Sequence, residues 1–239
     1  MSWLFEKLEK RLIIRGTIEA ITPLHIGSGK PEIELGGHEM PIVKDLSGQP
    51  YIPGSSLKGK TRAEAERILR KEGVDVCFPP NVKTMCGTKK ANPDSFCPCC
   101  KIFGTAGSIS VASKTKFRDA YPTKKVETLS RVGIAIDRST GTVAEHALYT
   151  IEAAPSGTVF DFEIVTENLT DEELKILCKA LKSVEDSALG GSSTRGFGKV
   201  KINIERVVER SAGYYLGKEG EKELSGEALK SWLTEKGCT

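Results

Sequence analysis

The chain has 239 residues and 38% of them are apolar, which is enough for a real core in one large domain or one domain with insertions. No apolar run approaches the ~18 residues of a membrane span, and the charged N-terminal segment lacks a signal-peptide cleavage site, so a cytoplasmic protein is predicted. The net charge is only +3, but residues 81–131 hold ten Lys or Arg against three Asp or Glu. This basic stretch is either a surface that faces a polyanion or a solvated lysine-rich loop.

The first elements in chain order are strands. Residues 10–21 alternate between apolar and polar side chains, as a strand does. Two shorter strands are predicted at 40–45 and 49–54. A Ser-Gly turn separates them, and Asp45 is expected to order that turn.

Helices and further strands follow. Ser55 or Ser56 is expected to cap a helix that runs to about residue 71, and Thr170 with Glu173 forms a capping box for a second helix. The remaining predicted elements are strands at 108–121, 158–165 and 198–208 and a last helix that starts at residue 225.

Two segments interrupt this order and are predicted to be insertions. Residues 73–103 show no period and hold five cysteines, whereas residues 122–157 are long, polar and punctuated by glycine. Without them the order is strand, helix, strand, strand, helix, strand. This order predicts an α+β, ferredoxin-like fold of the kind that RNA-recognition domains share. We therefore expect one domain over residues 1–239 with two insertions.

Two glycine-rich loops raise the question of nucleotide binding. PGSSLKGKTR at 53–62 fits the P-loop pattern, and GGSSTRGFGK at 190–199 has a similar composition. A P-loop follows a buried parallel strand and opens a helix, but here the pattern would lie inside the predicted helix, and the Walker-B-like VGIAIDR lies in a polar insertion. Glycines, a helix start and basic side chains are also the parts of a grip on a phosphate backbone. The plain alternative is a pair of tight turns with solubilising lysines.

Cysteines are the second chemical signal, because five of the seven lie within residues 77–100. In a cytoplasmic chain such clustering indicates a metal site rather than disulfides. Cys97 and Cys100 have the C-x-x-C spacing that lets two thiolates bind one zinc, and Cys77 and Cys86 complete a set of four. Four thiolates leave no open position, so the predicted zinc is structural and folds an insertion that lacks a core of its own.

The other cysteines are assigned less directly. Cys99 is an alternative ligand to either cysteine of the C-x-x-C pair. Cys178 lies on the apolar side of the second predicted helix and is expected in the core.

Seven short segments stand in a recognisable order over about residues 10–205. They are PLHIGSG, MPIVKD, PYIPGSSLKGKTR, CKIFG, KFRDAY, RVGIAIDRSTGTVAEHALYTIE and LGGSSTRGFGKV. In this order they resemble the RAMP superfamily, in particular the Cas-seven-type backbone subunits of type III (Csm-like) CRISPR effector complexes. The resemblance implies a modified RNA-recognition fold with a zinc-bearing insertion at 73–103 and a projecting thumb hairpin at 122–157. It also implies copies stacked along a guide RNA beside other subunits, with each thumb kinking the guide–target duplex.

The resemblance assigns roles to the glycine-rich loops as well. It implies that both loops hold phosphates of the guide RNA. The residues implied to contact RNA are His25, Ser55, Lys58, Arg62, Gly191, Arg195 and Lys199.

One position departs from the family pattern. Cleaving members carry an aspartate two residues before the proline of the segment that matches MPIVKD, and here that residue is Glu39. The resemblance implies that the carboxylate works with Mg²⁺ while a ribose 2′-hydroxyl of target RNA attacks the adjacent phosphate. Glu39 is therefore either the catalytic residue of a metal-dependent endoribonuclease or a solvated loop residue.

Several functions remain open at this point. The favoured one is a backbone subunit that binds guide RNA and organises, or also cleaves, complementary target RNA in antiviral defence. The alternatives are a stand-alone RAMP endoribonuclease that processes CRISPR transcripts with His25 as acid or base, a binding subunit without catalysis, and a P-loop NTPase. The zinc-bearing insertion and the long thumb favour the backbone subunit.

Overall fold

Strand β1 (Lys10–Ala20) is central in an antiparallel sheet, and its side chains alternate between two faces. Leu12, Ile14 and Ile18 are buried on one face, whereas Arg15 is exposed on the other. The alternation in the sequence is therefore that of a strand with one buried face. The structure, a computed structural model, describes residues 5–29 and 38–238.

The main sheet is antiparallel throughout and has the strand order β2-β6-β1-β7-β8, with β3 pairing separately with β6. In addition to β1, the sheet contains β2 (Thr115–Phe117), β3 (Tyr121–Pro122), β6 (Val159–Glu167), β7 (Val200–Ser211) and β8 (Lys222–Leu224). Strands and helices alternate in the predicted order once the inserted segments are left out. The predicted α+β class is confirmed.

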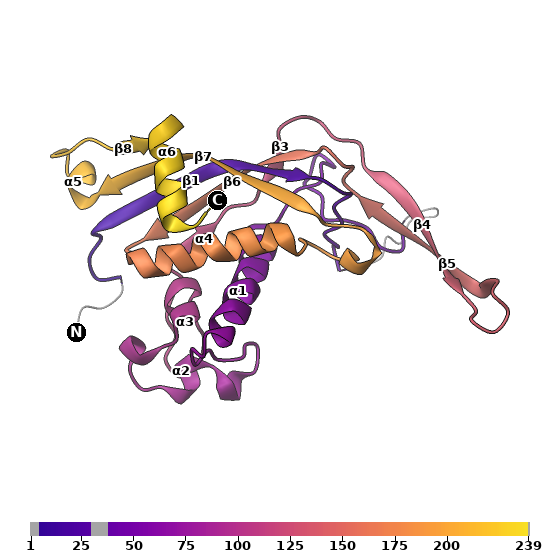
Figure 1. Ribbon diagram of the computed structural model, residues 1–239, viewed down its shortest axis with the longest axis horizontal. Helices are drawn as coiled ribbons and strands as arrows, with labels where there is room; N and C mark the ends of the chain where they lie inside the picture. The colour runs from indigo at the N-terminus through magenta and orange to yellow at the C-terminus, as the bar shows by residue number, and fades with distance from the viewer. Residues whose placement is uncertain (1–4, 30–37, 239) are drawn as a thin grey trace.

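Helices α1 (Gly54–Lys71) and α4 (Asp171–Asp186) cover one face of this sheet and pack against each other (Figure 1). Leu57 of α1 and Leu177 of α4 are buried in the same hydrophobic core. A buried carboxylate also joins the two helices, because Glu64 accepts a hydrogen bond of 2.9 Å from the hydroxyl of Ser183. None of the helices in residues 5–29 and 38–238 is both long and apolar enough to cross a membrane.

The start of α4 follows the local signal in the sequence. The hydroxyl of Thr170 accepts a hydrogen bond from the amide of Glu173, and the Glu173 carboxylate accepts one from the amide of Thr170. The predicted capping box is confirmed.

The start of α1 differs from the prediction. The helix begins at Gly54, and neither Ser55 nor Ser56 caps it with a side chain. The Gly54 amide instead donates a hydrogen bond of 2.7 Å to the carboxylate of Asp119. A Cβ atom at Gly54 would lie 2.2 Å from the carbonyl oxygen of Phe117, so only glycine permits this close approach. The expected serine cap was wrong because the cap comes from a distant segment.

The cysteine-rich segment forms short helices below α1 and α4 (Figure 1). They are η1 (Val82–Thr84), α2 (Cys86–Lys89), η2 (Pro93–Ser95) and α3 (Pro98–Phe103). Phe96, Ile102 and Phe103 belong to the same buried cluster as the side chains under the sheet. The segment is therefore an extension of the main core.

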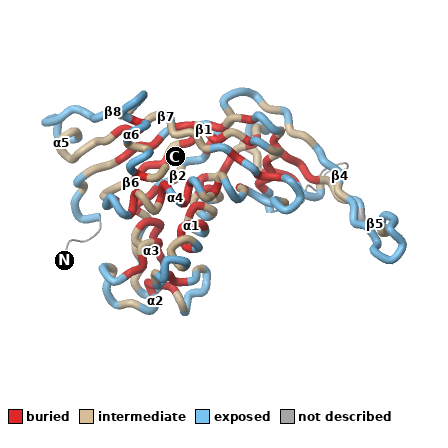
Figure 2. Tube along the Cα trace, viewed as in Figure 1, coloured by how far each residue is buried: buried red, intermediate tan, exposed pale blue. Residues whose placement is uncertain are grey.

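A two-stranded hairpin of β4 (Leu129–Ile136) and β5 (Val143–Ala153) extends away from the sheet (Figure 1). Its outer part is exposed (Figure 2), but Ile151, Ala153 and Ala154 at its base are buried. The projecting part is therefore shorter than residues 122–157. Val132, Ile134 and Leu148 are apolar side chains that the hairpin leaves 48–63% exposed.

The segment before α1 is less regular than predicted. Residues 40–45 and 49–54 make only isolated bridges, among them Met40 to Ile151 and Ile52 to Ala120. The turn between them is as expected, because Asp45 accepts hydrogen bonds from the amides of Ser47 and Gln49. The short elements near the C-terminus are η3 (Ser193–Arg195), α5 (Ala212–Tyr215) and α6 (Gly226–Lys236).

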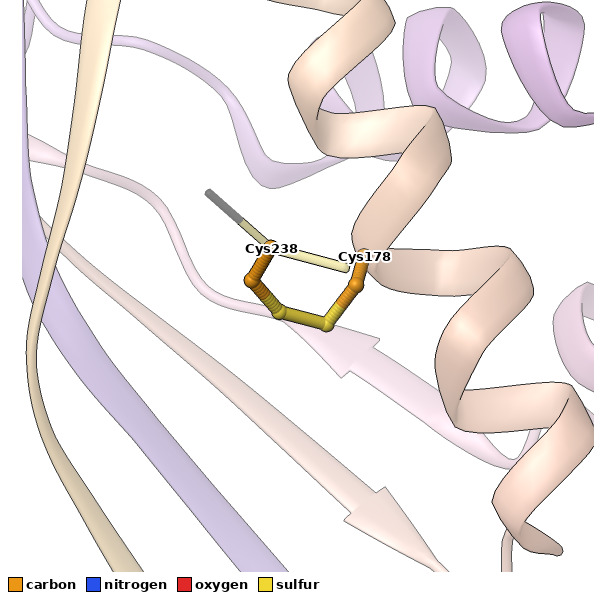
Figure 3. The surroundings of a disulfide bond; sticks show 2 residues. All are labelled: Cys178 and Cys238. Carbon is orange, nitrogen blue, oxygen red and sulfur yellow. A yellow bond between two sulfur atoms is a disulfide. The ribbon is translucent and has the colours of Figure 1, made fainter. Parts of the chain in front are cut away.

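A disulfide joins Cys178 of α4 to Cys238, just after α6 (Figure 3). Cys178 is buried, as the sequence predicts, but it is not a free core thiol. The bond fastens the end of the chain to a helix 60 positions earlier, on the side of α4 that α6 covers.

Candidate functional site

The P-loop pattern does not form a phosphate-binding loop. Gly59, Lys60 and Thr61 lie within α1, and the sheet beside them is antiparallel. The Thr61 hydroxyl is buried and donates to the carbonyl of Leu57, while Lys60 forms an ion pair with Glu64 at 2.8 Å. These side chains stabilise the helix, and the NTPase interpretation is wrong.

The Walker-B-like segment has a different role as well. Asp137 is exposed at the tip of the hairpin, where its carboxylate accepts hydrogen bonds from the amides of Ser139 and Thr140. It orders the turn between β4 and β5.

Four cysteine sulfurs form a compact buried group. The Sγ atoms of Cys77, Cys86, Cys97 and Cys100 all lie within 4.8 Å of one another. The separation is 3.9 Å between Cys77 and Cys97 and 3.3 Å between Cys77 and Cys100. A tetrahedral zinc with bonds of about 2.3 Å would place its sulfurs about 3.8 Å apart. The donor set and its spacing therefore fit zinc, and Cys99 lies outside the group.

The thiols of this group differ in their electrostatics. A hydrogen bond from Cys100 lowers the pKa of Cys97, which favours the thiolate form that binds metals, whereas the same bond raises the pKa of Cys100 and burial raises that of Cys86. Burial raises the pKa of Cys99 to about 12 and keeps that thiol protonated. Cys99 is a buried core side chain outside the group of four sulfurs.

Helix α1 presents the first group of predicted RNA contacts. Ser55 is exposed in its first turn, and Lys58 is half-buried one turn later. Burial, together with repulsion from Arg62, lowers the pKa of Lys58. Arg62 itself points toward the cysteines, because its guanidinium donates to Glu66, to the carbonyl of Gly104 and to the sulfur of Cys100.

The second group gathers around the loop at residues 190–199. The amide of Gly191 donates a hydrogen bond of 2.8 Å to the carbonyl of His25. A Cβ at Gly191 would lie 3.1 Å from the imidazole ring, so glycine leaves room for the histidine. Arg195 and Lys199 are exposed on this loop. The structure therefore brings together the predicted residues His25, Gly191, Arg195 and Lys199.

His25 is held in one tautomer. Its Nδ1 atom lies 2.7 Å from the carbonyl oxygen of Glu152, and a carbonyl can only accept, so Nδ1 carries the proton. The neutral ring then presents Nε2 as an acceptor. The side chain is only 4% exposed, which makes loop ordering its main role in this structure.

Strand β5 joins these residues to Glu39. Arg195 stacks over the ring of Tyr149 at 5.3 Å, and the amide of Glu39 donates a hydrogen bond of 3.1 Å to the hydroxyl of Thr150. Glu39 is exposed. Residues 30–37, which precede this segment, lie outside the described residues.

Glu152 is the functional candidate that the sequence did not reveal. Its carboxylate is 1% exposed, forms an ion pair with Lys44 and accepts hydrogen bonds from the hydroxyl of Thr128 and the amide of Ile42. Burial alone would raise its pKa, but the bonds from Lys44 and Thr128 outweigh burial and lower the pKa. The side chain thus ties the segment that carries Glu39 to the base of the hairpin. A glutamate inside an otherwise apolar strand end, YTIEAA, was the available signal.

Comparison with known proteins places this arrangement in a family. The sequence profile described as RAMPs, RAMP superfamily, matches residues 17–201. That range includes both glycine-rich loops, the cysteine cluster and the hairpin. The chain belongs to the RAMP superfamily.

The chain is similar to named proteins and to a solved structure. The chain is 34% identical to the CRISPR system Cms endoribonuclease Csm3 of Methanocaldococcus jannaschii, over 92% of this chain and 90% of that protein. It is 32% identical to the protein of the same name from Methanothermobacter thermautotrophicus, over 91% and 94%. Its fold is similar to a chain in the crystal structure of the Csm3-Csm4 subcomplex of the type III-A CRISPR-Cas interference complex, with a TM-score of 0.60, 28% identity and 97% coverage of both chains.

Proposed function

We propose that the chain is a backbone subunit of a type III CRISPR ribonucleoprotein, in which copies of it bind guide RNA and organise complementary target RNA. The observation that carries the proposal is the joint position of the loop at 190–199 and the segment of Glu39 on one strand, β5. This arrangement puts exposed basic side chains next to a carboxylate at the base of a projecting hairpin. The names of the relatives and the subcomplex of the structural neighbour support the same assignment.

The RNA-binding surface of the proposal consists of the loop at 190–199 and the start of α1. Arg195 and Lys199 supply charge beside glycines whose amides a phosphate can approach. Ser55 and Lys58 supply a hydroxyl and an ammonium near the positive end of the α1 dipole. Contacts of this kind position an RNA backbone without selecting its sequence.

The hairpin of β4 and β5 acts as the thumb in this proposal. Ile134 and Leu148 are cross-strand partners, and both expose apolar side chains on one face of the hairpin. Apolar side chains on a narrow projection favour contact with bases or with a neighbouring subunit.

The cysteine cluster is the proposed zinc site, and its function is structural. Cys77, Cys86, Cys97 and Cys100 would supply all four ligands, which leaves no position for substrate. The zinc would fix the four short helices η1, α2, η2 and α3 relative to one another.

Cleavage of target RNA is the catalytic part of the proposal, with Glu39 as the acting residue. The ribose 2′ oxygen would form a bond to the adjacent phosphorus while the bond to the 5′ oxygen of the next nucleotide breaks, which leaves a 2′,3′-cyclic phosphate. Glu39 can accept the 2′-hydroxyl proton or help to hold Mg²⁺, and the leaving 5′ oxygen would take up a proton from water. Among the described residues the cysteines form the only group of three or more metal-binding side chains. Mg²⁺ would therefore need RNA phosphates for its other ligands, which is its common mode.

Reconstitution tests the proposal. The chain is produced in cells together with a CRISPR RNA and the proteins encoded beside it, and the purified particle is analysed by mass spectrometry and RNA sequencing. A particle with several copies of the chain on one guide RNA, and with the other subunits, is expected. An isolated chain that cuts CRISPR transcripts without metal, and loses this with His25→Ala, would instead establish the stand-alone endoribonuclease.

A further inference from the structure

Three charged side chains form a row along one face of α1. Arg62, Glu66 and Arg70 are four residues apart, and Glu66 accepts from Arg62 at 2.8 Å and from Arg70 at 3.3 Å. Residues at this spacing lie one above the other on a helix. The Glu66 side chain is only 9% exposed, so the row is mostly buried between α1 and the cysteine-rich segment.

The two arginines of this row also donate hydrogen bonds to different parts of the cysteine-rich segment. Arg62 donates to the sulfur of Cys100 at 3.6 Å and to the carbonyl of Gly104, which ends α3, at 2.9 Å. Arg70 donates to the carbonyl of Cys77 at 2.8 Å. Cys77 precedes α2 and η2 in the chain, and Cys100 follows them. The arginines of the row therefore fix both of these cysteines relative to the single helix α1.

We propose that Arg62, Glu66 and Arg70 are the outer shell of the zinc centre, and that Arg62 serves this centre rather than a guide-RNA phosphate. The inference rests on the proposed zinc site. Four thiolates and one zinc ion carry a net charge of −2, which is costly in a buried place unless cations and hydrogen bonds face it. The two guanidiniums face the centre, the Glu66 carboxylate between them separates their like charges, and the row as a whole offsets about half of that negative charge.

The planar guanidinium is the group that suits this position. Arg62 uses three separate nitrogen atoms for Glu66, Gly104 and Cys100, and a lysine ammonium cannot reach three acceptors in one plane. These bonds engage all three nitrogen atoms and three of the five N–H groups of Arg62, so the guanidinium is already oriented toward the cysteine cluster. On α1 the exposed Ser55 and the half-buried Lys58 remain for RNA.

Metal affinity of the full chain tests the assignment. Zinc-loaded wild type, Arg62→Gln and Arg62→Lys are titrated with a chromogenic chelator, and the zinc dissociation constant is measured. Loss of a side chain that orients a metal ligand typically weakens metal binding about 10- to 100-fold. Arg62→Gln should show such a loss, and Arg62→Lys a smaller one because it keeps the charge.

Arg67→Gln is the matched control, because Arg67 lies on the same helix, is 69% exposed and forms its ion pair with Glu64, away from the cysteine cluster. It should keep the wild-type zinc affinity. A second readout is the cobalt-substituted protein, whose thiolate-to-cobalt absorption band should shift in Arg62→Gln and stay unchanged in Arg67→Gln. This spectrum reports the sulfur environment and does not follow a general loss of stability.

The outcomes separate the outer shell from the zinc site itself. A wild type that binds no zinc would overturn both proposals. A wild type that binds zinc, with Arg62→Gln equal to it in affinity and spectrum, would overturn the outer shell alone. So would a zinc-loaded Arg62→Gln protein with normal metal binding and weakened RNA binding, because Arg62 would then be a phosphate contact.

Discussion

Lys44 and Glu152 form an ion pair in which Nζ lies 2.5 Å from Oε1, although the two residues are far apart in sequence. Lys44 follows the segment of Glu39, and Glu152 lies at the base of the hairpin, where its own backbone carbonyl accepts the hydrogen bond from His25. Because the carboxylate is 1% exposed, water does not replace Lys44 as its partner. The pair therefore fixes the candidate cleavage segment relative to the hairpin.

Replacing Glu152 by Gln should lower the free energy of unfolding by roughly 2 kcal/mol, because a buried hydrogen-bond network loses its charged member. The folded-state pKa of Glu152 is lowered, so its contribution is complete above the ordinary glutamate pKa and is lost as pH falls through the folded pKa. The difference between wild type and Glu152→Gln should therefore shrink on acidification. Urea unfolding at neutral and at acidic pH measures it. A difference that grew on acidification would contradict the network.

The second prediction concerns metal content. Cys97→Ser with Cys100→Ser should abolish zinc binding and lower the melting temperature, because two of four ligands are lost. Cys99→Ser is the control, since Cys99 is buried nearby but outside the group, and it should keep its zinc. Elemental analysis of the purified proteins decides the matter. Zinc that persisted in the double variant would contradict the site.

RNA binding provides the third prediction. Arg195→Ala and Lys199→Ala should each weaken binding to single-stranded RNA of any sequence, because they remove exposed charge from the loop. Each should also flatten the dependence of log affinity on log salt concentration by roughly 0.7 per lost phosphate contact. Lys230→Ala, an exposed lysine on α6, is the control and should change neither quantity. Equal affinities for all four proteins at several salt concentrations would remove the loop from the interface.

The hairpin leads to a prediction about assembly. Ile134→Ser combined with Leu148→Ser should leave the melting temperature nearly unchanged, because both side chains are 48–63% exposed. The same variant should disturb target binding or subunit stacking in the reconstituted particle, observed by sedimentation and by RNA protection. Leu216→Ser, which alters an apolar side chain of 68% exposure outside the hairpin, should behave as wild type. A folded double variant with normal particles would show that the hairpin face has no partner.

Glu39 gives the last prediction. In a guide-loaded particle, Glu39→Ala should abolish metal-dependent cutting of matching RNA without weakening target binding, because an exposed carboxylate repels phosphates. Glu39→Asp should keep or raise the rate, since an aspartate is the residue that the family resemblance implies at this position. Gel analysis of cut fragments and a separate binding assay measure the two effects. Equal cutting by wild type and Glu39→Ala would exclude this residue from the mechanism.

The sequence predicts features that depend on neighbouring residues and misses those that depend on distant ones. The capping box of Thr170 and Glu173 spans one helical turn, and its residues alone determine it. The cap of α1 does not follow this rule, because Asp119 reaches Gly54 across 65 positions. The residues near the start of α1 therefore predicted a serine cap, which the structure does not have.

The same distinction applies to the candidate sites. The group of four cysteines was predictable because two of them share a C-x-x-C spacing and the other two lie close to them in sequence. The role of Glu152 was not predictable, because its partners Lys44 and Thr128 meet only after the hairpin has folded back. The excess of basic residues at 81–131 does not by itself define an exposed basic surface. Lys114 in this stretch is buried and forms an ion pair with Glu173 at 2.9 Å.

The hydrophobic core continues without a break from the sheet into the cysteine-rich segment, where Cys97 and Cys100 are among its members. A ligand that binds only the folded state stabilises whatever unfolds together with its site. Zinc would therefore stabilise the sheet and helices along with the short segment that holds the ion. Cellular zinc would then limit how many copies of the chain are folded at a given moment, and through them the length of guide RNA that can be covered.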